Sequence, residues 1–361
     1  MKRLFALAFV LCLVLCACAE HPIETIPTTE PTTEPTTEPT TEPTTEPTEP
    51  PVLYRNPLNG EPMDAPYEGR IVAVVINNLK DCLPQFGISQ ADMLYEVEAE
   101  GGITRFLAVY SDLTDVGSIG PVRSARTFFN NIALSYEAPI VHCGGSVRGR
   151  NAYADKTGSK IQNWAHLDEV SNGSYFFRDK ERYNQGMNWE HTLFTNGEKL
   201  LKAMEAKGYA DTEQRDFGLQ FDDEVVLDSF IANKVVVKFR NDKITTFTYD
   251  ESTGLYATEQ YNMPHIDGAT GEQVCFKNLI VVHTSQSFRH DGEYSRSYYE
   301  LVGEGGGYLA VNGQIIKIKW SREALDSPFV YTFEDGTPVT LNEGSTYVAI
   351  ACGERGTVDY E

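Results

Sequence analysis

Arg70-Ile-Val-Ala-Val-Val-Ile76 decides the fold class, because it is a short continuous apolar run rich in β-branched residues. Such a run is typical of a strand that is buried on both faces of a sheet. A similar run, Pro139-Ile-Val-His-Cys143, follows a helical pattern over 121–137 in which Pro121 takes a favoured first-turn position. With a strand predicted over 105–110, the order strand, helix, strand indicates a βαβ unit. We therefore expect an α/β domain with a mostly parallel sheet.

Two further segments extend this domain. Residues 93–99 alternate, with Tyr95 and Val97 on one side and Glu96 and Glu98 on the other, which predicts a half-buried strand. Asn196 is expected to cap a helix over 198–207 that Gly208 ends. The predicted α/β domain spans residues 52–220.

The pattern changes after about residue 222, where short strand-like segments alternate with turn signals and no convincing helix occurs. This predicts a β-rich domain over 221–361. The glycine run Gly303–Gly307 lacks the Lys-Ser/Thr of a phosphate loop and is interpreted as a wide turn. The predicted strands cover 234–240, 243–249, 255–260, 279–284, 298–302, 314–320, 330–333 and 347–351.

The N-terminus has the features of an export signal. Met1-Lys2-Arg3 precedes an apolar core over 4–15 that is too short for a permanent membrane span. Leu15-Cys-Ala-Cys18 looks like a bacterial lipobox, which predicts a signal peptide over 1–17 and lipidation of Cys18, with palmitate-type chains. Several acyl chains give stable anchoring, so we expect a protein tethered to the outer face of the cytoplasmic membrane. The alternative is a plain secretory signal that is cut after Ala17 or Ala19.

A stalk is predicted over 18–51. Thr-Thr-Glu-Pro occurs five times between Thr28 and Pro47, and a proline at every fourth residue blocks a regular helix and a sheet ladder. Because nothing in this segment can build a core, we expect a disordered, extended spacer.

Charge and cysteine content exclude several functions. The net charge is −22, and since residues 1–50 hold two basic and eight acidic residues, residues 51–361 carry −16. A body this acidic is a poor partner for nucleic acid or anionic lipid. Four cysteines are widely spaced, which permits disulfides or free buried thiols but does not suit zinc. We predict no metal and no cofactor. These cysteines are Cys82, Cys143, Cys275 and Cys352.

Basic residues nevertheless gather between 101 and 150, where Arg105, Arg123, Arg126, Arg148 and Arg150 lie. A helix that starts at Pro121 has Arg123 and Arg126 in its first turns, where a cation is unfavourable unless an anion compensates. Either a carboxylate such as Glu96 or Glu100 packs against them, or the site binds an anionic ligand. If the strands are parallel, their C-terminal ends meet at one such site. The predicted ligand-binding residues are Asn77, Asn78, Arg105, Ser118, Arg123, Ser124, Arg126, His142, Gly144 and Gly145.

A catalytic alternative uses carboxylates. Glu96 and Glu100 share one strand face, and two such groups can serve as acid and base in glycoside cleavage. A hydrolase of wall glycan or peptide would combine them with His142. A solvent-exposed face or partners for the arginines explains them more simply. His191 and His265-Ile-Asp267 are interpreted as loop structure rather than as a site.

Four ordered motifs resemble the YerB-like bacterial lipoprotein family, and the resemblance spans about residues 65–352. It implies an N-terminal α/β domain, a β-rich C-terminal domain and a lipoprotein of the cell envelope, but no particular reaction. Thr192 stands where similar sequences tend to have Asn, which weakens a catalytic role at His191. The motifs are Ala73–Asn78, Ser89–Glu96, Glu100–Phe106 and Ile119–Arg126, joined by His265-Ile-Asp267 and Asn278–Val282 in the second domain.

Taken together, these patterns favour a membrane-tethered envelope lipoprotein that is a non-catalytic binding module rather than an enzyme. Its partner is expected to be an anionic envelope ligand or an envelope protein, with no nucleic acid bound.

Overall fold

The computed structural model describes residues 53–146, 166–209, 216–240, 242–291, 293–352 and 356–361. Within these ranges, eleven strands form one large sheet that takes strands from both halves of the chain. Their order is β12-β22-β21-β18-β25-β4-β5-β3-β7-β8, and β23 pairs with β22. Their bounds are β3 (Val72–Asn77), β4 (Met93–Glu98), β5 (Thr104–Tyr110), β7 (Ile140–His142), β8 (His166–Asp168), β12 (Phe230–Ile231), β18 (Asn278–Thr284), β21 (Gly303–Val311), β22 (Gln314–Arg322), β23 (Val330–Thr332) and β25 (Thr346–Cys352).

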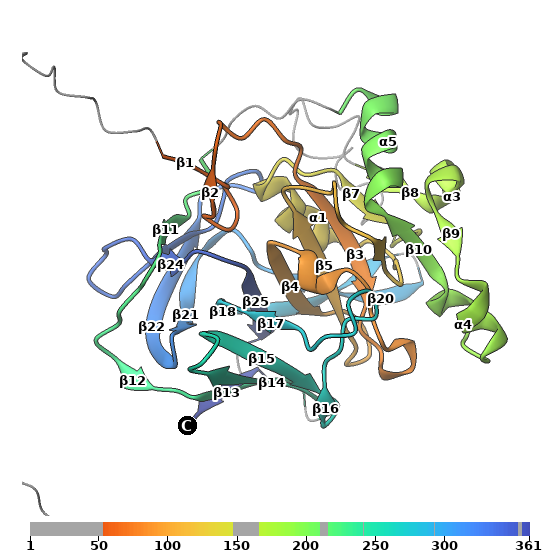
Figure 1. The fold of residues 1–361 in the computed structure, drawn as a ribbon. Coiled ribbons are helices and arrows are strands. Elements are labelled where there is room, and N and C mark those ends of the chain that lie inside the picture. Colours follow the sequence, from red (N-terminus) through yellow and green to blue (C-terminus); the bar gives the residue numbers. More distant parts are fainter. Residues whose placement is uncertain (1–52, 147–165, 210–215, 241, 292, 353–355) are drawn as a thin grey trace, which may run out of the picture. The chain divides into compact units, whose positions relative to one another are not determined.

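A second sheet is built entirely from the C-terminal half, in the order β16-β15-β14-β13-β26, with β17 beside β15. Figure 1 shows β13, β14 and β15 as a layer of their own next to the large sheet. The bounds are β13 (Lys234–Arg240), β14 (Lys243–Asp250), β15 (Leu255–Gln260), β16 (Met263–Pro264), β17 (Cys275–Phe276) and β26 (Thr357–Tyr360).

The remaining elements are short. The helices are α1 (Thr127–Ser135), α3 (Glu169–Asn172), α4 (Lys180–Asn184) and α5 (Gly197–Lys207), with 3₁₀ turns at Lys80–Cys82, Ile88–Gln90, Gly173–Tyr175 and Trp189–His191. The remaining strands are β1 (Tyr54–Arg55), β2 (Pro62–Met63), β6 (Ser118–Ile119), β9 (Phe177–Arg178), β10 (Leu193–Asn196), β11 (Gln220–Asp222), β19 (Gln286–Asp291), β20 (Tyr294–Tyr299) and β24 (Thr340–Asn342). In the part of the chain described, no helix has the length and apolar character that a membrane crossing requires.

The predicted fold class is wrong. Strands make up 47% of the structure and helices 15%, and the N-terminal half has a mixed sheet. Strand β3 runs parallel to β7 but antiparallel to β5, and β4 also runs antiparallel to β5. The expected βαβ unit does not form, since β5 and β7 lie on opposite sides of β3. An apolar run indicates burial on both faces of a sheet, but it does not indicate the direction of the neighbouring strands.

The large sheet has a core on each face. On one face, Phe128, Phe129 and Ile132 of α1 pack with residues such as Val75 and Leu107. On the other, the second sheet packs through Val235, Val237 and Phe247 against Leu94, Phe106 and Tyr347. Strand β4 is therefore buried along its whole length. Its predicted alternation is correct, but the prediction of a half-buried strand is wrong, because the face that carries the glutamates is covered.

Several local predictions in the rest of the chain are confirmed. The side chain of Asn196 accepts a hydrogen bond from the Lys199 N–H, and Gly208 ends α5 in the left-handed region at φ 69°. Strands β13 and β15 have the predicted bounds. The interpretation of Gly303–Gly307 as a turn is wrong, because these residues begin β21 and pair with residues 318–322 of β22. The division into domains at residue 220 stays a prediction.

Candidate functional site

One edge of the large sheet collects polar strand ends. Strands β3, β7 and β8 are mutually parallel, and β4 runs in the same direction because both β3 and β4 are antiparallel to β5. Their C-terminal ends therefore lie at the same edge as the start of β5. This edge carries Asn77, Glu98, His142 and Asp168, together with Arg105 near the start of β5.

The segment 121–125 fills the gap between the ends of β3 and β7. The Arg123 N–H donates to the Val75 carbonyl at 2.9 Å, and the Cys143 N–H donates to the Arg123 carbonyl at 3.0 Å. The Ala125 N–H donates to the Gly144 carbonyl at 3.1 Å, and Ala125 forms a bridge with Gly145. This segment thus satisfies its backbone groups with the sheet, which is why the helix begins at Thr127 and not at the predicted Pro121.

Four arginines surround two carboxylates at this edge, and we call them the arginine cluster: Arg105, Arg123, Arg126 and Arg296. Glu100 accepts two hydrogen bonds from the Arg126 guanidinium, one of them at 2.8 Å from Nη2, and lies 3.4 Å from Arg296 Nη1. Glu190 lies 3.1 Å from Arg123 Nη1. Among the described residues, Arg105 forms no ion pair. The cluster therefore has more cations than carboxylates to balance them.

Arg105 is the most unusual of these residues, since only 8% of it is exposed. Its Nη1 donates to the Ser124 carbonyl at 2.9 Å, whereas its buried Nε has no hydrogen-bond partner among the described residues. Burial, followed by repulsion from Arg126, lowers the pKa of Arg105 to about 9. The side chain is therefore still protonated at neutral pH, as a buried charge without a counterion in contact.

Glu100 is held ionised by its neighbours. Burial acts to raise its pKa, but the hydrogen bonds and charge of Arg126, with the charges of Arg105 and Arg296, lower it overall. The expected pairing of Glu100 with Arg126 is thus present. Because Glu100 is bonded to Arg126, Arg105 has no carboxylate in direct contact.

Glu96 is not part of this cluster. It is fully buried under the second sheet, where Lys243 Nζ lies 2.9 Å from its Oε1. It also accepts hydrogen bonds from Asn78, Thr104, Thr245 and Tyr347. Asn78, predicted as a ligand-binding residue, is likewise committed to Glu96, through a bond of 2.9 Å.

The structure does not bring Glu96 and His142 together. Their strands, β4 and β7, are separated by β5 and β3, which amounts to about 14 Å at the usual strand spacing of about 4.8 Å. His142 instead contacts the Gly144 carbonyl at 2.7 Å and the His166 ring at 2.9 Å. The neighbouring Cys143 thiol lies near Glu169, and burial followed by this carboxylate raises its pKa to about 11. It is therefore a poor nucleophile.

Asn77 and Ser118, which were also predicted to bind a ligand, contact other residues of the protein instead. Asn77 bonds to the His191 ring at 2.9 Å, and burial lowers the pKa of His191. Ser118 lies on β6, paired with Asn196 of β10, and no described contact joins it to the arginine cluster.

The segment around His265 joins the two halves of the chain. His265 bonds to Gln85 at 2.9 Å, and Asp267 accepts from the N–H groups of Gly87 and Ser89. Cys18, Arg148 and Arg150 lie outside the described residues.

Arg296 of the cluster, and Glu190, which pairs with Arg123, were missing from the predicted site. Arg296 comes from β20, whose Tyr299 hydroxyl donates to the Glu98 carbonyl at 2.8 Å and whose Tyr299 ring contacts Phe128 edge-on at 5.1 Å. No local pattern indicates this long-range docking. Among the described residues, no group of three or more His, Cys, Asp or Glu side chains is arranged to hold a metal.

Comparison with known proteins gives a consistent match. Residues 58–210 match the family model described as "Protein of unknown function (DUF3048) N-terminal domain", and residues 235–348 match the corresponding C-terminal domain. "Putative lipoprotein YerB" of Bacillus subtilis (strain 168) is 29% identical over 287 residues, covering 78% of this chain and 81% of YerB. The crystal structure of the B. subtilis YerB protein superposes with a TM-score of 0.72 at 26% identity, covering 84% of this chain and 99% of that one. The chain therefore belongs to the YerB-like family, with its N-terminal and C-terminal DUF3048 domains in that order.

Proposed function

We propose that this chain is an extracytoplasmic lipoprotein, anchored through Cys18 to the outer face of the cytoplasmic membrane, whose body binds an anionic envelope ligand at the arginine cluster. The binding is non-catalytic, and the ligand presents a phosphate or carboxylate group.

The anchoring part rests on the lipobox-like Leu15–Cys18 and on the similarity to a protein named as a lipoprotein. Triacylation of Cys18 supplies more than the two membrane-binding signals that stable attachment needs. The Thr/Glu/Pro stalk would then separate the body from the membrane surface.

Arg105 is the observation that carries the binding part. A guanidinium that is 8% exposed and has no carboxylate in contact is costly for the free protein. An incoming anion would offset this cost by accepting hydrogen bonds from the cluster, because guanidinium groups match phosphate and carboxylate oxygens in pairs. Arg123 and Arg296 each have a buried Nε without a partner among the described residues. Their side chains are 18% and 26% exposed, so a ligand can reach the cluster from solvent.

The environments of the two carboxylates favour a binding function over a hydrolase. A glycosidase needs one protonated and one ionised carboxyl group beside the scissile bond. Glu96 is buried with Lys243, and Glu100 has a lowered pKa and is paired with Arg126. Neither group suits the role of a general acid.

Thermal unfolding of the full chain in detergent, with and without inorganic phosphate, tests this proposal, and citrate serves as the carboxylate probe. We expect one or both anions to raise the Tm, and the double variant Arg105→Gln/Arg123→Gln to lose the increase. Lys202→Gln is the control, because Lys202 is an exposed cation on α5 that pairs with Glu198 and is not part of the cluster. An equal increase in all three proteins, or no increase in the unsubstituted chain, would refute ligand binding at the cluster. The proposal would also be refuted if the chain captured an envelope protein but bound neither anion.

A further inference from the structure

A second site lies on the C-terminal half, far along the sheet order from the arginine cluster. A cavity of ≈ 650 Å³ opens over β21 and β22, and a smaller one of ≈ 270 Å³ adjoins it. Both are lined by Tyr308, Lys317 and Glu334, so they form one continuous depression, which we call the aromatic groove. Its size falls within the range of about 300–1,000 Å³ that is usual for ligand pockets.

Four rings follow one another along this groove. The ring centroids of Phe230 and Tyr360 are 6.4 Å apart, those of Tyr360 and Tyr308 6.3 Å, and those of Tyr308 and His283 5.8 Å. Phe230 is 70% exposed and Tyr360 39%. Tyr308 and His283 are half-buried. Large rings are normally buried, and two exposed rings that continue into a half-buried row beside a cavity indicate a binding surface.

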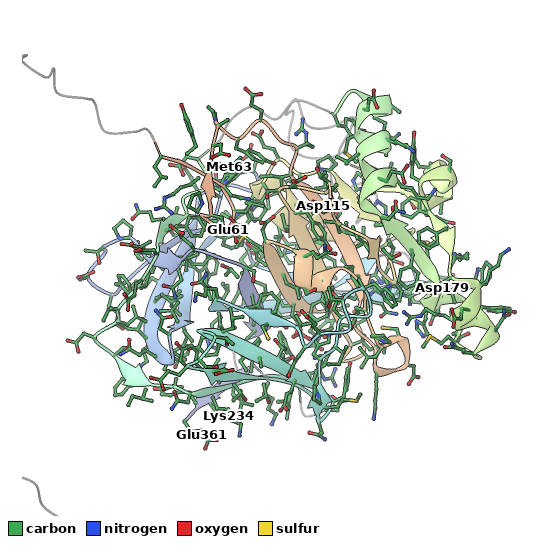
Figure 2. The ribbon with its side chains drawn as sticks, viewed as in Figure 1. Glu61, Met63, Asp115, Asp179, Lys234 and Glu361 are labelled. Carbon is green, nitrogen blue, oxygen red and sulfur yellow. The ribbon has the colours of Figure 1, made fainter. Side chains whose placement is uncertain are left out.

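The row is held in place by strand pairing. Tyr360 lies on β26, whose end is fastened by backbone bonds between Lys234 and Glu361 and by an ion pair of 2.9 Å between their side chains. Figure 2 labels these two residues next to each other at the end of the chain. Phe230 pairs with Ile315 across β12 and β22. The rings are therefore presented on a rigid framework, which reduces the entropy cost of binding.

Glycines keep the floor of the groove low. Gly306 lies opposite Lys319 in the ladder, and a Cβ atom at this position would meet no atom within 4 Å, so the space above it is open. At Gly305 a Cβ would overlap the Trp320 indole, which donates a hydrogen bond of 2.9 Å to the His283 carbonyl. Gly305, Gly306 and Gly307 thus form a stretch of strand without side chains beside the row of rings.

The charges along the groove are mixed. Lys317 and Lys319 are accompanied by Glu304 and Glu334, and the body as a whole carries −16. A polyanion is therefore not favoured here. Burial lowers the pKa of His283, so its ring is neutral at pH 7. Exposed rings with a rim of polar and charged groups suit a ligand that has apolar C–H faces and many hydroxyl groups.

We propose that the aromatic groove binds a linear, uncharged saccharide chain, whose sugar rings contact the row from Phe230 to His283 through their C–H groups. The planes of neighbouring rings are inclined by 37°, 57° and 73°, so the row offers ring faces and ring edges in turn to the C–H groups of the chain. Lys317, Lys319 and Glu334 hydrogen-bond its hydroxyl or acetamido groups. The site is distinct from the arginine cluster and does not depend on it.

Isothermal titration calorimetry of the full chain in detergent with the hexamer of β-1,4-linked N-acetylglucosamine, and with cellohexaose, tests this inference. We expect at least one hexamer to bind, and Phe230→Ala and Tyr360→Ala each to weaken that binding about tenfold. Gly306→Leu should abolish it, because the new side chain fills the groove without a clash at Cβ. Phe288→Ala is the matched control, since Phe288 is 53% exposed on β19, outside the groove.

Circular dichroism and the Tm of each variant verify that it is folded. No binding of either hexamer at millimolar concentration overturns the proposal, as does binding that Phe230→Ala and Tyr360→Ala leave unchanged. Binding of extended peptides alone would also overturn it.

Discussion

Replacing Arg105 by methionine should make the free protein more stable. The pKa of the Arg105 side chain falls from 12.5 to about 9 in the folded chain. At about 1.4 kcal/mol for each pKa unit, the charged form is disfavoured by about 5 kcal/mol on folding. Methionine keeps the side-chain length and removes this cost, but it loses the bond to the Ser124 carbonyl, worth about 1.5–3 kcal/mol. The expected net gain is about 2 kcal/mol.

The difference in stability between Arg105→Met and the unsubstituted chain depends on pH, and this dependence can be measured. Below pH 9 Arg105 is protonated in both the folded and the unfolded chain, so the cost is fully present at pH 7. As the pH rises through 9, the folded state releases its proton first, and the unsubstituted chain gains stability relative to the variant. Urea unfolding at pH 7 and pH 9.5 should therefore show the advantage of Arg105→Met shrinking with pH.

A buried arginine elsewhere provides the control. Arg322 is 2% exposed, and burial lowers its pKa to about 10, but its guanidinium donates to four backbone carbonyls, among them that of Ser327 at 2.8 Å. Arg322→Met should destabilise the protein, because it leaves these carbonyls without a donor. If Arg105→Met destabilises it as much, Arg105 is a structural residue, and the reasoning behind the arginine cluster fails.

Three further predictions concern ionisable groups elsewhere in the chain. Lys243→Met should cost about 3–5 kcal/mol, because it leaves Glu96 buried without its cation; urea unfolding measures this, and a neutral effect would contradict it. Burial, then the charge of Lys243, lowers the pKa of His265 to about 3, so the folded chain should lose stability as the pH falls from 6.5 towards 3. His265→Gln should flatten that dependence between pH 7 and 4.5, and an unchanged slope would show that other groups cause it. The Cys143 thiol, with its pKa raised to about 11, should react with iodoacetamide much more slowly than glutathione at pH 7.5, as mass spectrometry can record; an equal rate would contradict the raised pKa.

The sequence predicted local elements better than their arrangement. The cap of α5 at Asn196 and the bounds of β13 and β15 depend on short-range patterns, and these were correct. The run 70–76 correctly indicated a doubly buried strand. It could not reveal that β5 runs antiparallel to this strand, because apolar residues carry no information about the direction of the neighbouring strand.

The errors arise where distant segments supply the backbone partners. Gly303–Gly307 looks like a turn by composition, but its ladder with β22 outweighs the low strand propensity of glycine. The start of α1 was placed too early because residues 121–125 hydrogen-bond to β3 and β7 instead of continuing the helix. The arginines at 105, 123 and 126 were recognised from the sequence, whereas Arg296 reaches them only through the docking of β20.

The place of β25 in the large sheet has a consequence for how the chain is made. Residues 346–350 of β25 pair in parallel with β4, while β18 pairs along the other side of β25. During synthesis β4 emerges some 250 residues before this partner, and an unpaired strand edge invites wrong pairing. This edge of β4 therefore stays unpaired until β25 has been made. A truncation just before residue 346 should leave the edge exposed, which makes the N-terminal half susceptible to proteases and to aggregation.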